Sequence, residues 1–340
     1  MQTSKRALTV WLGSVLSLML LSGCELPPMD SEQQGFRGTG MVQINNPEST
    51  VVTGEVPEAA PLAPAAGPKA GDLYQNVQVL GDLSIGEFTR LMAAMTEWVA
   101  PEEGCNHCHV GGDLASDDIY TKVVSRRMLE MTQTLNASYT PHVGNTGVTC
   151  YTCHRGKNVP ENIWTLDDAP PRAANAGWRA GQNQAGTSTN GFTSLPYDPF
   201  RKYFAEQMEN LGGIRVASTT ALPTTDRNPQ NIKDAEETYA LMMHLSESLG
   251  VNCTFCHNSR AFASWEESSP ARVKAWHGLG MVQAVNEQFL APLASALPAE
   301  RKGLSGDAPK VNCASCHQGQ NKPLGGAEMA KHYPALLGKR

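Results

Sequence analysis

The stretch "VTCYTCHRG", residues 148–156, contains a C-x-x-C-H string, in which two cysteines three positions apart are followed directly by a histidine. The string occurs four times in this chain of 340 residues. Two thiols at this spacing can add to the two vinyl groups of one haem, and the adjacent histidine then reaches the iron as its proximal ligand. The sequence therefore predicts four covalently bound c-type haems, held by Cys105, Cys108 and His109; Cys150, Cys153 and His154; Cys253, Cys256 and His257; and Cys313, Cys316 and His317.

Two other uses of paired cysteines fit this pattern less well. Zinc sites also use C-x-x-C, but two such pairs usually meet around one metal, and no histidine needs to follow each pair. Disulfides stabilise many exported proteins, but they do not require four identical C-x-x-C-H strings. The chain is 41% hydrophobic and only 6% aromatic, so a purely protein core would be lean for this length. Four macrocycles would supply the missing apolar interior.

The N-terminus has the pattern of an export signal. Lys5 and Arg6 precede a run of sixteen mainly apolar residues, and small residues follow. Such a run is shorter than the roughly 20 residues that span a bilayer. Cys24, the one cysteine outside the four strings, ends "LSGC", which resembles a bacterial lipobox. We expect residues 1–23 to be removed and Cys24 to carry a lipid anchor; the alternative is a cysteine lost with the signal.

Charge limits the class of partner. The formal net charge is −6 at pH 7, and removal of the signal would take away two basic residues and no acidic ones. An acidic exported surface argues against nucleic acid and suits a basic soluble partner.

The remaining chain reads as a duplicated helical protein. Residues 24–74 are rich in Pro, Ala and Gly and predict an extended tether or arm. Beyond them, "RMLEMTQTLNASY" (127–139) aligns with "HGLGMVQAVNEQF" (277–289), which indicates an internal repeat. We therefore predict a mainly α protein with extensive irregular loops. It has two dihaem halves, 75–160 and 231–325, a loop-rich connection, 161–230, and a C-terminal tail, 326–340.

Helix boundaries can be predicted in both halves. Ser84 with Glu87 three residues later forms a capping-box pattern, and apolar residues then recur at helical spacing. Asp234 with Glu237 gives the same pattern in the second half, where Gly250 should end the helix.

A haem whose iron has a sixth ligand from the protein mainly carries electrons, whereas a haem without one can bind a substrate. Methionines stand on predicted helices before the first three strings, at Met92, Met128 and Met242. A methionine on an amphipathic helix usually packs in the core. Spacing alone also leaves a rival in each case, namely Met95, Met131 and Met243.

The fourth string breaks this pattern. In the repeat alignment Gly278 faces Met128, so the helix before "VNCASCH" has no methionine at the equivalent place, only Met281, which faces the rival Met131. His142, in "YTPHVGN", belongs to no C-x-x-C-H string and is a candidate ligand. From the residues alone, an exposed loop histidine is an equally good interpretation.

Four C-x-x-C-H strings, the methionine-bearing helices, the lipobox and "GFRGTGM" (35–41) together resemble the tetrahaem cytochrome c subunit of purple-bacterial photosynthetic reaction centres. The resemblance covers essentially the whole chain. It implies a multihaem cytochrome c fold whose two dihaem halves are related by a pseudo-two-fold axis. It also implies axial ligand pairs, in chain order, of His109 with Met92, His154 with Met128, His257 with Met242, and His317 with His142.

The same resemblance implies a function and partners. Members of this family lie on the periplasmic face of the L and M subunits, in a complex that also contains H. They reduce the photo-oxidised bacteriochlorophyll special pair and are refilled by a soluble donor, either a small cytochrome c or a high-potential iron–sulfur protein. An exported multihaem reductase with one open haem is the alternative, and a free-standing electron-storage protein is a third. No catalytic Ser/His/Asp set or phosphate loop stands out, and His107, His244, His277 and His332 are interpreted as packing or surface residues.

Overall fold

The computed structural model describes residues 55–166, 199–205 and 232–338, the single positions 195 and 214, and two short strands. The strands, β1 (Asp30–Gln33) and β2 (Val42–Asn45), form an antiparallel pair. The export signal, Cys24 and the "GFRGTGM" stretch lie outside the described residues. Otherwise the described part consists of helices and irregular loops, as predicted.

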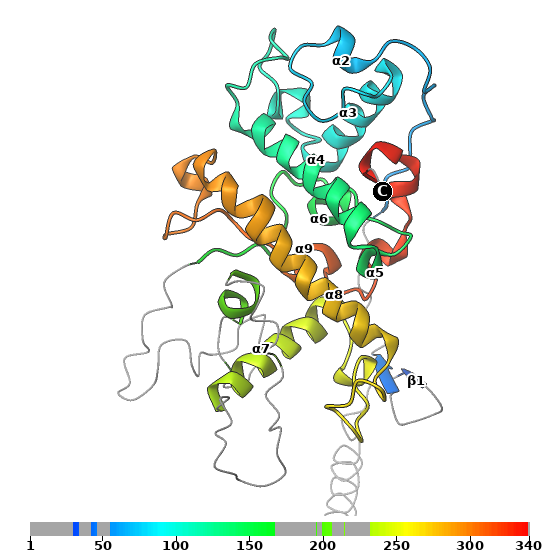
Figure 1. Cartoon of the computed structure of the whole chain (residues 1–340), viewed down its shortest axis with the longest axis vertical. Helices are drawn as coiled ribbons and strands as arrows, with labels where there is room; N and C mark the ends of the chain where they lie inside the picture. Colours follow the sequence, from blue (N-terminus) through cyan, green and yellow to red (C-terminus); the bar gives the residue numbers. More distant parts are fainter. Residues whose placement is uncertain are drawn as a thin grey trace, which may run out of the picture.

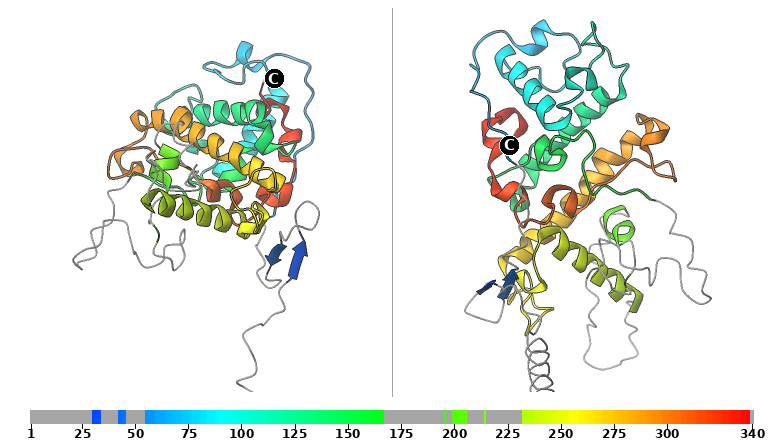
Figure 2. Two further views of the ribbon diagram at one scale, coloured as in Figure 1. Left: turned by 60° about the horizontal axis from the view of Figure 1, so that its bottom comes forward. Right: turned by 180° about the vertical axis from the view of Figure 1, so that it is seen from behind.

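Four long helices determine the shape of the molecule. They are α3 (Ile85–Val99), α4 (Tyr120–Ser138), α7 (Ile232–Leu249) and α8 (Pro270–Ala284). Along the long axis they follow one another in the order α3, α4, α8, α7 (Figure 1), and the view from behind agrees (Figure 2). Along this axis α8 comes before α7, which is the reverse of their order in the chain.

Short elements connect these helices and carry the motifs. Motifs 2 and 4 lie on α6 and α9, which pack against α3 and α7 respectively. Irregular loops and single helical turns make up the remainder. The short elements are α2 (Ala70–Leu73), η2 (Gly104–His107), α5 (Thr140–Val143), α6 (Cys150–His154), η3 (Arg201–Ala205), η5 (Cys253–Phe255), η6 (Val285–Leu290), η7 (Ala291–Ser295), η8 (Ala299–Arg301), α9 (Cys313–His317), η9 (Pro323–Gly326), η10 (Met329–His332) and η11 (Pro334–Leu336).

The predicted capping box of α3 is confirmed. Ser84 is the N-cap, its hydroxyl accepts a hydrogen bond from the Glu87 N–H, and the Glu87 carboxylate accepts one from the Ser84 N–H. These bonds satisfy two backbone donors that the first turn of a helix otherwise leaves unpaired.

The predicted start of α7 is wrong. The helix begins at Ile232, so Asp234 lies inside its first turn and is not the cap. Asp234 and Glu237 instead form ion pairs with the ammonium group of Lys202, with N···O distances of 2.8 and 2.5 Å. Charge pairing with a segment 32 residues away has replaced local capping. The end of the helix is as predicted, because α7 stops at Leu249 and Gly250 has a φ of 63°.

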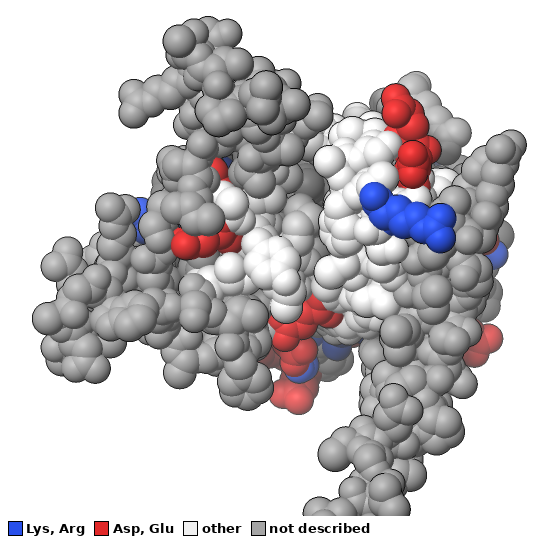
Figure 3. Space-filling view, turned by 90° about the horizontal axis from the view of Figure 1, so that it is seen from below, with Lys and Arg blue, Asp and Glu red and all other residues white. Residues whose placement is uncertain are grey.

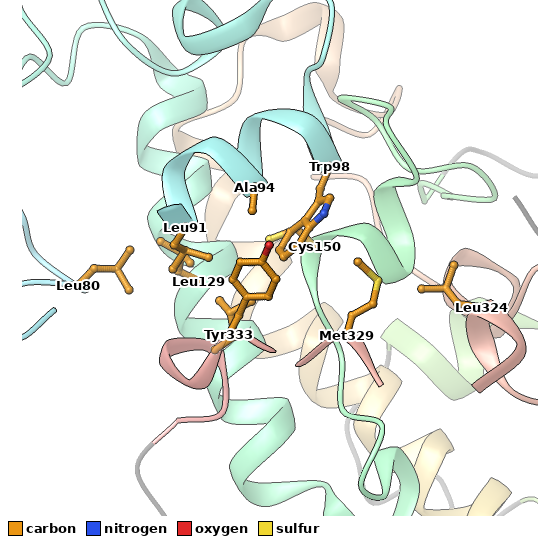
Figure 4. Packing of buried hydrophobic residues seen from close by; sticks show 10 residues of the cluster. Leu80, Leu91, Ala94, Trp98, Leu129, Cys150, Leu324, Met329 and Tyr333 are labelled. Atoms are coloured by element: carbon orange, nitrogen blue, oxygen red, sulfur yellow. The ribbon is translucent and has the colours of Figure 1, made fainter. Parts of the chain in front are cut away.

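One apolar cluster joins α3, α4 and α6 to the C-terminal segment. Leu91 and Trp98 of α3 are almost fully buried in it. The rings of Trp98 and Tyr333 meet edge to face at 4.7 Å (Figure 4). The Arg90 guanidinium lies 4.1 Å above the Tyr333 ring. The segment predicted as a tail therefore packs on the first half of the chain.

Two further apolar clusters surround α8. Tyr203 and Phe204 of η3 pack with Leu241 of α7 on one side of this helix. Leu135 of α4 and Val143 of α5 pack on α8 in the other cluster. The apolar interior is thus divided among separate clusters instead of forming one core.

Two matched asparagines position the backbone before motifs 2 and 4. Asn136 of α4 accepts a hydrogen bond from Val148 N at 2.7 Å and donates to Val148 O at 2.9 Å. Asn286 of η6 does the same with Val311, at 2.8 and 3.0 Å. Val148 and Val311 each stand two residues before the first cysteine of a motif. Equivalent residues of the repeat therefore hold equivalent backbone.

Replacement of Asn136 by Ala should destabilise the protein by about 1–3 kcal/mol, because the partly buried Val148 N–H loses its partner. Thermal unfolding of the purified protein, followed by circular dichroism, measures this loss. The matched control on the same helix is Thr134→Ala, which removes an exposed hydroxyl and should change stability by about 0.5 kcal/mol or less. Equal losses in the two variants would contradict the prediction.

Candidate haem sites

The four C-x-x-C-H motifs fold in two ways. Motifs 2 and 4 are single α-helical turns, α6 and α9, and motifs 1 and 3 contain the 3-10 turns η2 and η5. The residue after each histidine of the α-helical pair, Arg155 or Gln318, has a left-handed backbone, with a φ of 49° or 48°. By local structure, motif 1 thus matches motif 3 and motif 2 matches motif 4.

Each motif histidine has its Nδ1 atom within hydrogen-bond distance of a backbone carbonyl. A carbonyl only accepts hydrogen bonds, so Nδ1 carries the proton and the lone pair lies on Nε2. This is how proteins orient histidines that bind metals. The pairs are His109 with Leu114 O (3.0 Å), His154 with Lys157 O (2.8 Å), His257 with Phe262 O (2.9 Å) and His317 with Gln320 O (2.8 Å).

His142 has the same arrangement. It lies on α5, which packs against α8, and its Nδ1 lies 2.9 Å from Lys274 O of that helix. Its ring centre is 5.9 Å from that of His317. An imidazole nitrogen binds a metal at about 2 Å and lies about 1 Å from its ring centre, so two imidazoles on opposite sides of one iron need centres roughly 6 Å apart. The structure thus brings His142 to the fourth motif at a separation that suits a shared iron.

Burial favours the neutral form of four of these imidazoles, which is the form that binds a metal. It lowers the pKa of His317 to about 4. Desolvation also lowers the pKa of His142, His154 and His257. Each of them therefore presents a free lone pair at neutral pH.

A cavity of about 1010 Å³ lies where motifs 2 and 4 meet. This volume is at the upper end of the range for small-molecule sites. His154 and His317 line it together with His142 and Met128, and aliphatic side chains such as Leu135 and Val143 form much of its wall. Nitrogen and sulfur donors inside an apolar wall fit a haem, whose macrocycle is apolar and whose iron takes these ligands.

The methionines can be compared with their rivals. Met131 packs in the apolar cluster of Leu135 and Val143, whereas Met128 of the same helix does not belong to that cluster. This favours Met128 as the free thioether. Met92 and its rival Met95 both pack against the Leu91 cluster, so packing does not separate them. Met242 packs against the Tyr203 cluster and Met243 does not, so this criterion does not favour Met242.

A signal that the sequence interpretation missed does separate the rivals. A hydroxyl residue follows Met92, Met128 and Met242 by four positions, and none follows Met95, Met131 or Met243. Thr96 and Thr132 donate these hydroxyls to the backbone carbonyls of Met92 and Met128, at 2.9 and 2.8 Å. Hydrogen bonds of this kind adjust the local course of a helix. Ser125 and Thr134 make the same bond to Thr121 O and Glu130 O on α4, so the bond accompanies Met92 and Met128 without being restricted to them.

Two of the eight motif cysteines are joined to each other. Cys153 and Cys316 form a disulfide with their Cα atoms 4.5 Å apart, whereas the other six are free thiols. A thioether to haem uses the same sulfur, so the two bonds exclude one another at these positions. Thioether attachment at Cys153 and Cys316 stays a prediction. The pairing shows that motifs 2 and 4 adjoin, and Arg155 also donates to Cys316 O at 3.2 Å.

The histidines outside the proposed ligand set differ in their burial and surroundings. His244 is buried against the edge of the Phe200 ring, at 4.6 Å, as a packing residue. His107, expected at the surface, is half-buried and lines the cavity.

In the part of the chain that the structure describes, no three His, Cys, Asp or Glu side chains gather as a metal-binding group. Nor is any helix there long and apolar enough to span a membrane.

Comparison with known proteins identifies the family of the chain. The family model for the photosynthetic reaction centre cytochrome C subunit matches residues 25–337. Photosynthetic reaction center cytochrome c subunits are similar over most of the chain. The one from Rubrivivax gelatinosus is 53% identical over 95% of this chain and 87% of the relative. The one from Thermochromatium tepidum is 50% identical over 95% of this chain and 78% of the relative. The one from Roseobacter denitrificans is 43% identical over 90% of this chain and 85% of the relative. This chain therefore belongs to the family of photosynthetic reaction centre cytochrome c subunits.

Proposed function

We propose that the chain binds four c-type haems and passes electrons from a soluble periplasmic donor to the photo-oxidised bacteriochlorophyll pair. Family membership makes it an electron-transfer protein rather than an enzyme, with covalently bound haem c, in association with a membrane-bound reaction centre. The observation that carries the proposal of four haems is the repeated histidine geometry. At all four motifs the histidine Nδ1 bonds to a backbone carbonyl, which leaves the histidine Nε2 free to bind iron.

Haem supplies reversible one-electron chemistry, and the protein supplies the ligands and an apolar environment. We propose His109 and Met92, His154 and Met128, and His257 and Met242 as the first three axial pairs. For the fourth we propose His317 and His142, supported by their ring separation and by the bond from His142 to α8. Two protein ligands on each iron leave no site for a substrate, which suits a carrier.

The motifs are ordered along the long axis. Motifs 2 and 4 adjoin at the centre, where α6 and α9 are in contact. Motif 1 lies beside α3 at one end, and motif 3 follows α7 at the other (Figure 1). We propose a file of haems in the order 1, 2, 4, 3, with two halves related by a pseudo-two-fold axis. The matched asparagines and the matched folding of motifs support the duplication.

The end that carries motif 3 is proposed to face the membrane. Strand β2 lies against η5 of this motif. Only five residues lie between Cys24 and Asp30, so a lipid on Cys24 would hold the strand pair within about 20 Å of the bilayer surface.

Exposed apolar side chains gather at the same end. Phe262, Trp265 and Trp276 are 50%, 42% and 37% exposed. Seen from below, the described surface combines uncharged side chains with some basic and acidic ones (Figure 3). We propose that these three residues, called the aromatic patch, contact the L and M subunits of a core that also contains H.

The opposite end suits the soluble donor. Glu102 and Glu103 are exposed beside motif 1, and Leu114, whose carbonyl holds His109, is 64% exposed. Carboxylates around an apolar contact favour a basic donor, so we propose a small cytochrome c ahead of a high-potential iron–sulfur protein.

Replacement of His142 by Leu should change the spectrum and reduction potential of the haem at Cys313 and Cys316, because its iron loses one ligand. A redox titration with spectral resolution of each haem measures this. The haem at Cys150 and Cys153 lies nearer to His142 in sequence and is the internal control. A change confined to that control haem would disprove ligation across the halves.

Carbon monoxide should not bind to the fully reduced native protein, because we propose two protein ligands on every iron. Spectra recorded before and after addition of the gas test this expectation. Rapid binding at one haem per chain would instead support the multihaem reductase.

Replacement of both Trp265 and Trp276 by Ser should weaken retention of the cytochrome by the detergent-solubilised core about tenfold or more, because interface aromatics often contribute 1.4 kcal/mol or more. Co-purification with the bacteriochlorophyll-containing subunits measures retention. Leu73→Ser is the control, since Leu73 is 58% exposed on α2, at the other end of the molecule. Equal retention of both variants would overturn the proposed contact.

A further inference from the structure

We propose that Gly278 selects the second ligand of the haem at Cys313 and Cys316, because only a residue without a side chain admits the His142 ring at this point of α8. The inference rests on the proposed function, in which this haem has two histidine ligands. It assigns to Gly278 the role of a positioning residue.

The first observation is steric. A methyl group on Gly278 would lie 2.5 Å from Cε1 of His142, 2.8 Å from Nδ1 and 3.1 Å from Nε2. Carbon atoms in contact prefer about 3.5–4.0 Å. The ring cannot yield easily, because His142 lies on α5 between Pro141 and the buried Val143, and α5 itself packs on α8. Any side chain at 278 would therefore displace the imidazole.

The second observation concerns the hydrogen bond that orients His142. Its acceptor, Lys274 O, lies one helical turn before Gly278. The Cα–Cβ bonds of a helix tilt toward its N-terminus, so a side chain at 278 would stand over that turn. A residue without Cβ thus provides the space for the ring and also access to the carbonyl that accepts the Nδ1 proton.

The third observation is the repeat. The position equivalent to Gly278 is Met128 of α4, the proposed thioether ligand of the haem at Cys150 and Cys153. Neighbouring repeat positions retain one role in both halves. Gln133 and Gln283, for example, each donate to the backbone carbonyl of a packed segment, Ala335 or Tyr203. At the position equivalent to Gly278 the first half has Met128, which we propose as a ligand, on the helix itself. The second half has Gly278, and the proposed ligand is His142 from the first half.

A glycine inside a helix also needs a reason. It costs about 1 kcal/mol relative to alanine, and Gly278 is buried within α8. Alanine at this position would strengthen the helix, so loss of ligation in such a variant cannot result from a weaker α8.

The test uses the complete, haem-loaded protein with Gly278→Ala and Gly278→Met. The alanine variant should lose His142 from the iron, so that the haem at Cys313 and Cys316 binds carbon monoxide, one per chain. The methionine variant should offer a thioether instead, and the reduction potential of that haem should rise, because methionine ligation raises it. The other three haems are internal references. If both variants bind no carbon monoxide and keep the native potential at this haem, the inference is overturned.

Two comparisons keep the result interpretable. If His142→Leu leaves this haem unchanged, the ligand assignment itself fails. If His142→Leu opens the haem and Gly278→Ala does not, only the role of Gly278 fails. Where Gly278→Ala does not accumulate, it is combined with His142→Gly, which removes the clash. Accumulation of this double variant supports the inference, and its absence contradicts it.

Discussion

The hydrogen bond from a histidine Nδ1 to a backbone carbonyl is the interaction on which the site depends. It recurs at His109, His154, His257 and His317, each with a carbonyl three or five residues later in the chain. The acceptors lie in the turn that follows each motif, so the motif and its turn form one unit. The bond fixes the tautomer and the direction of Nε2 before any metal is considered. Local chain geometry thereby orients the imidazole at each of the four motifs.

His142 obtains the same bond by a different route. Its acceptor is Lys274 O, 132 residues away on α8. The bond therefore requires the two halves to be packed together, whereas the four motif histidines need only their own turns. Ligation by His142 would in turn hold α5 against α8, so that packing and iron coordination would stabilise each other.

The apolar interior is arranged around the cavity where motifs 2 and 4 meet. Separate clusters form where α3 meets the C-terminal segment and on two sides of α8, and the cavity of about 1010 Å³ lies at the centre. A chain with 6% aromatic residues has little material for one continuous core. In a cytochrome c subunit the macrocycles contribute apolar surface that side chains supply in other proteins, so the helices need only small clusters to hold their order.

The sequence by itself determined the features that depend on neighbouring residues. The C-x-x-C-H strings predict haem attachment because both thiols and the histidine lie within five residues, and the capping box at Ser84 was predictable for the same reason. The tertiary structure decided what depends on distant residues. Asp234 pairs with Lys202 instead of capping α7, and Gly278 accommodates the His142 ring. A spacing pattern records which groups are adjacent along the chain, and only packing brings together groups that are far apart in it.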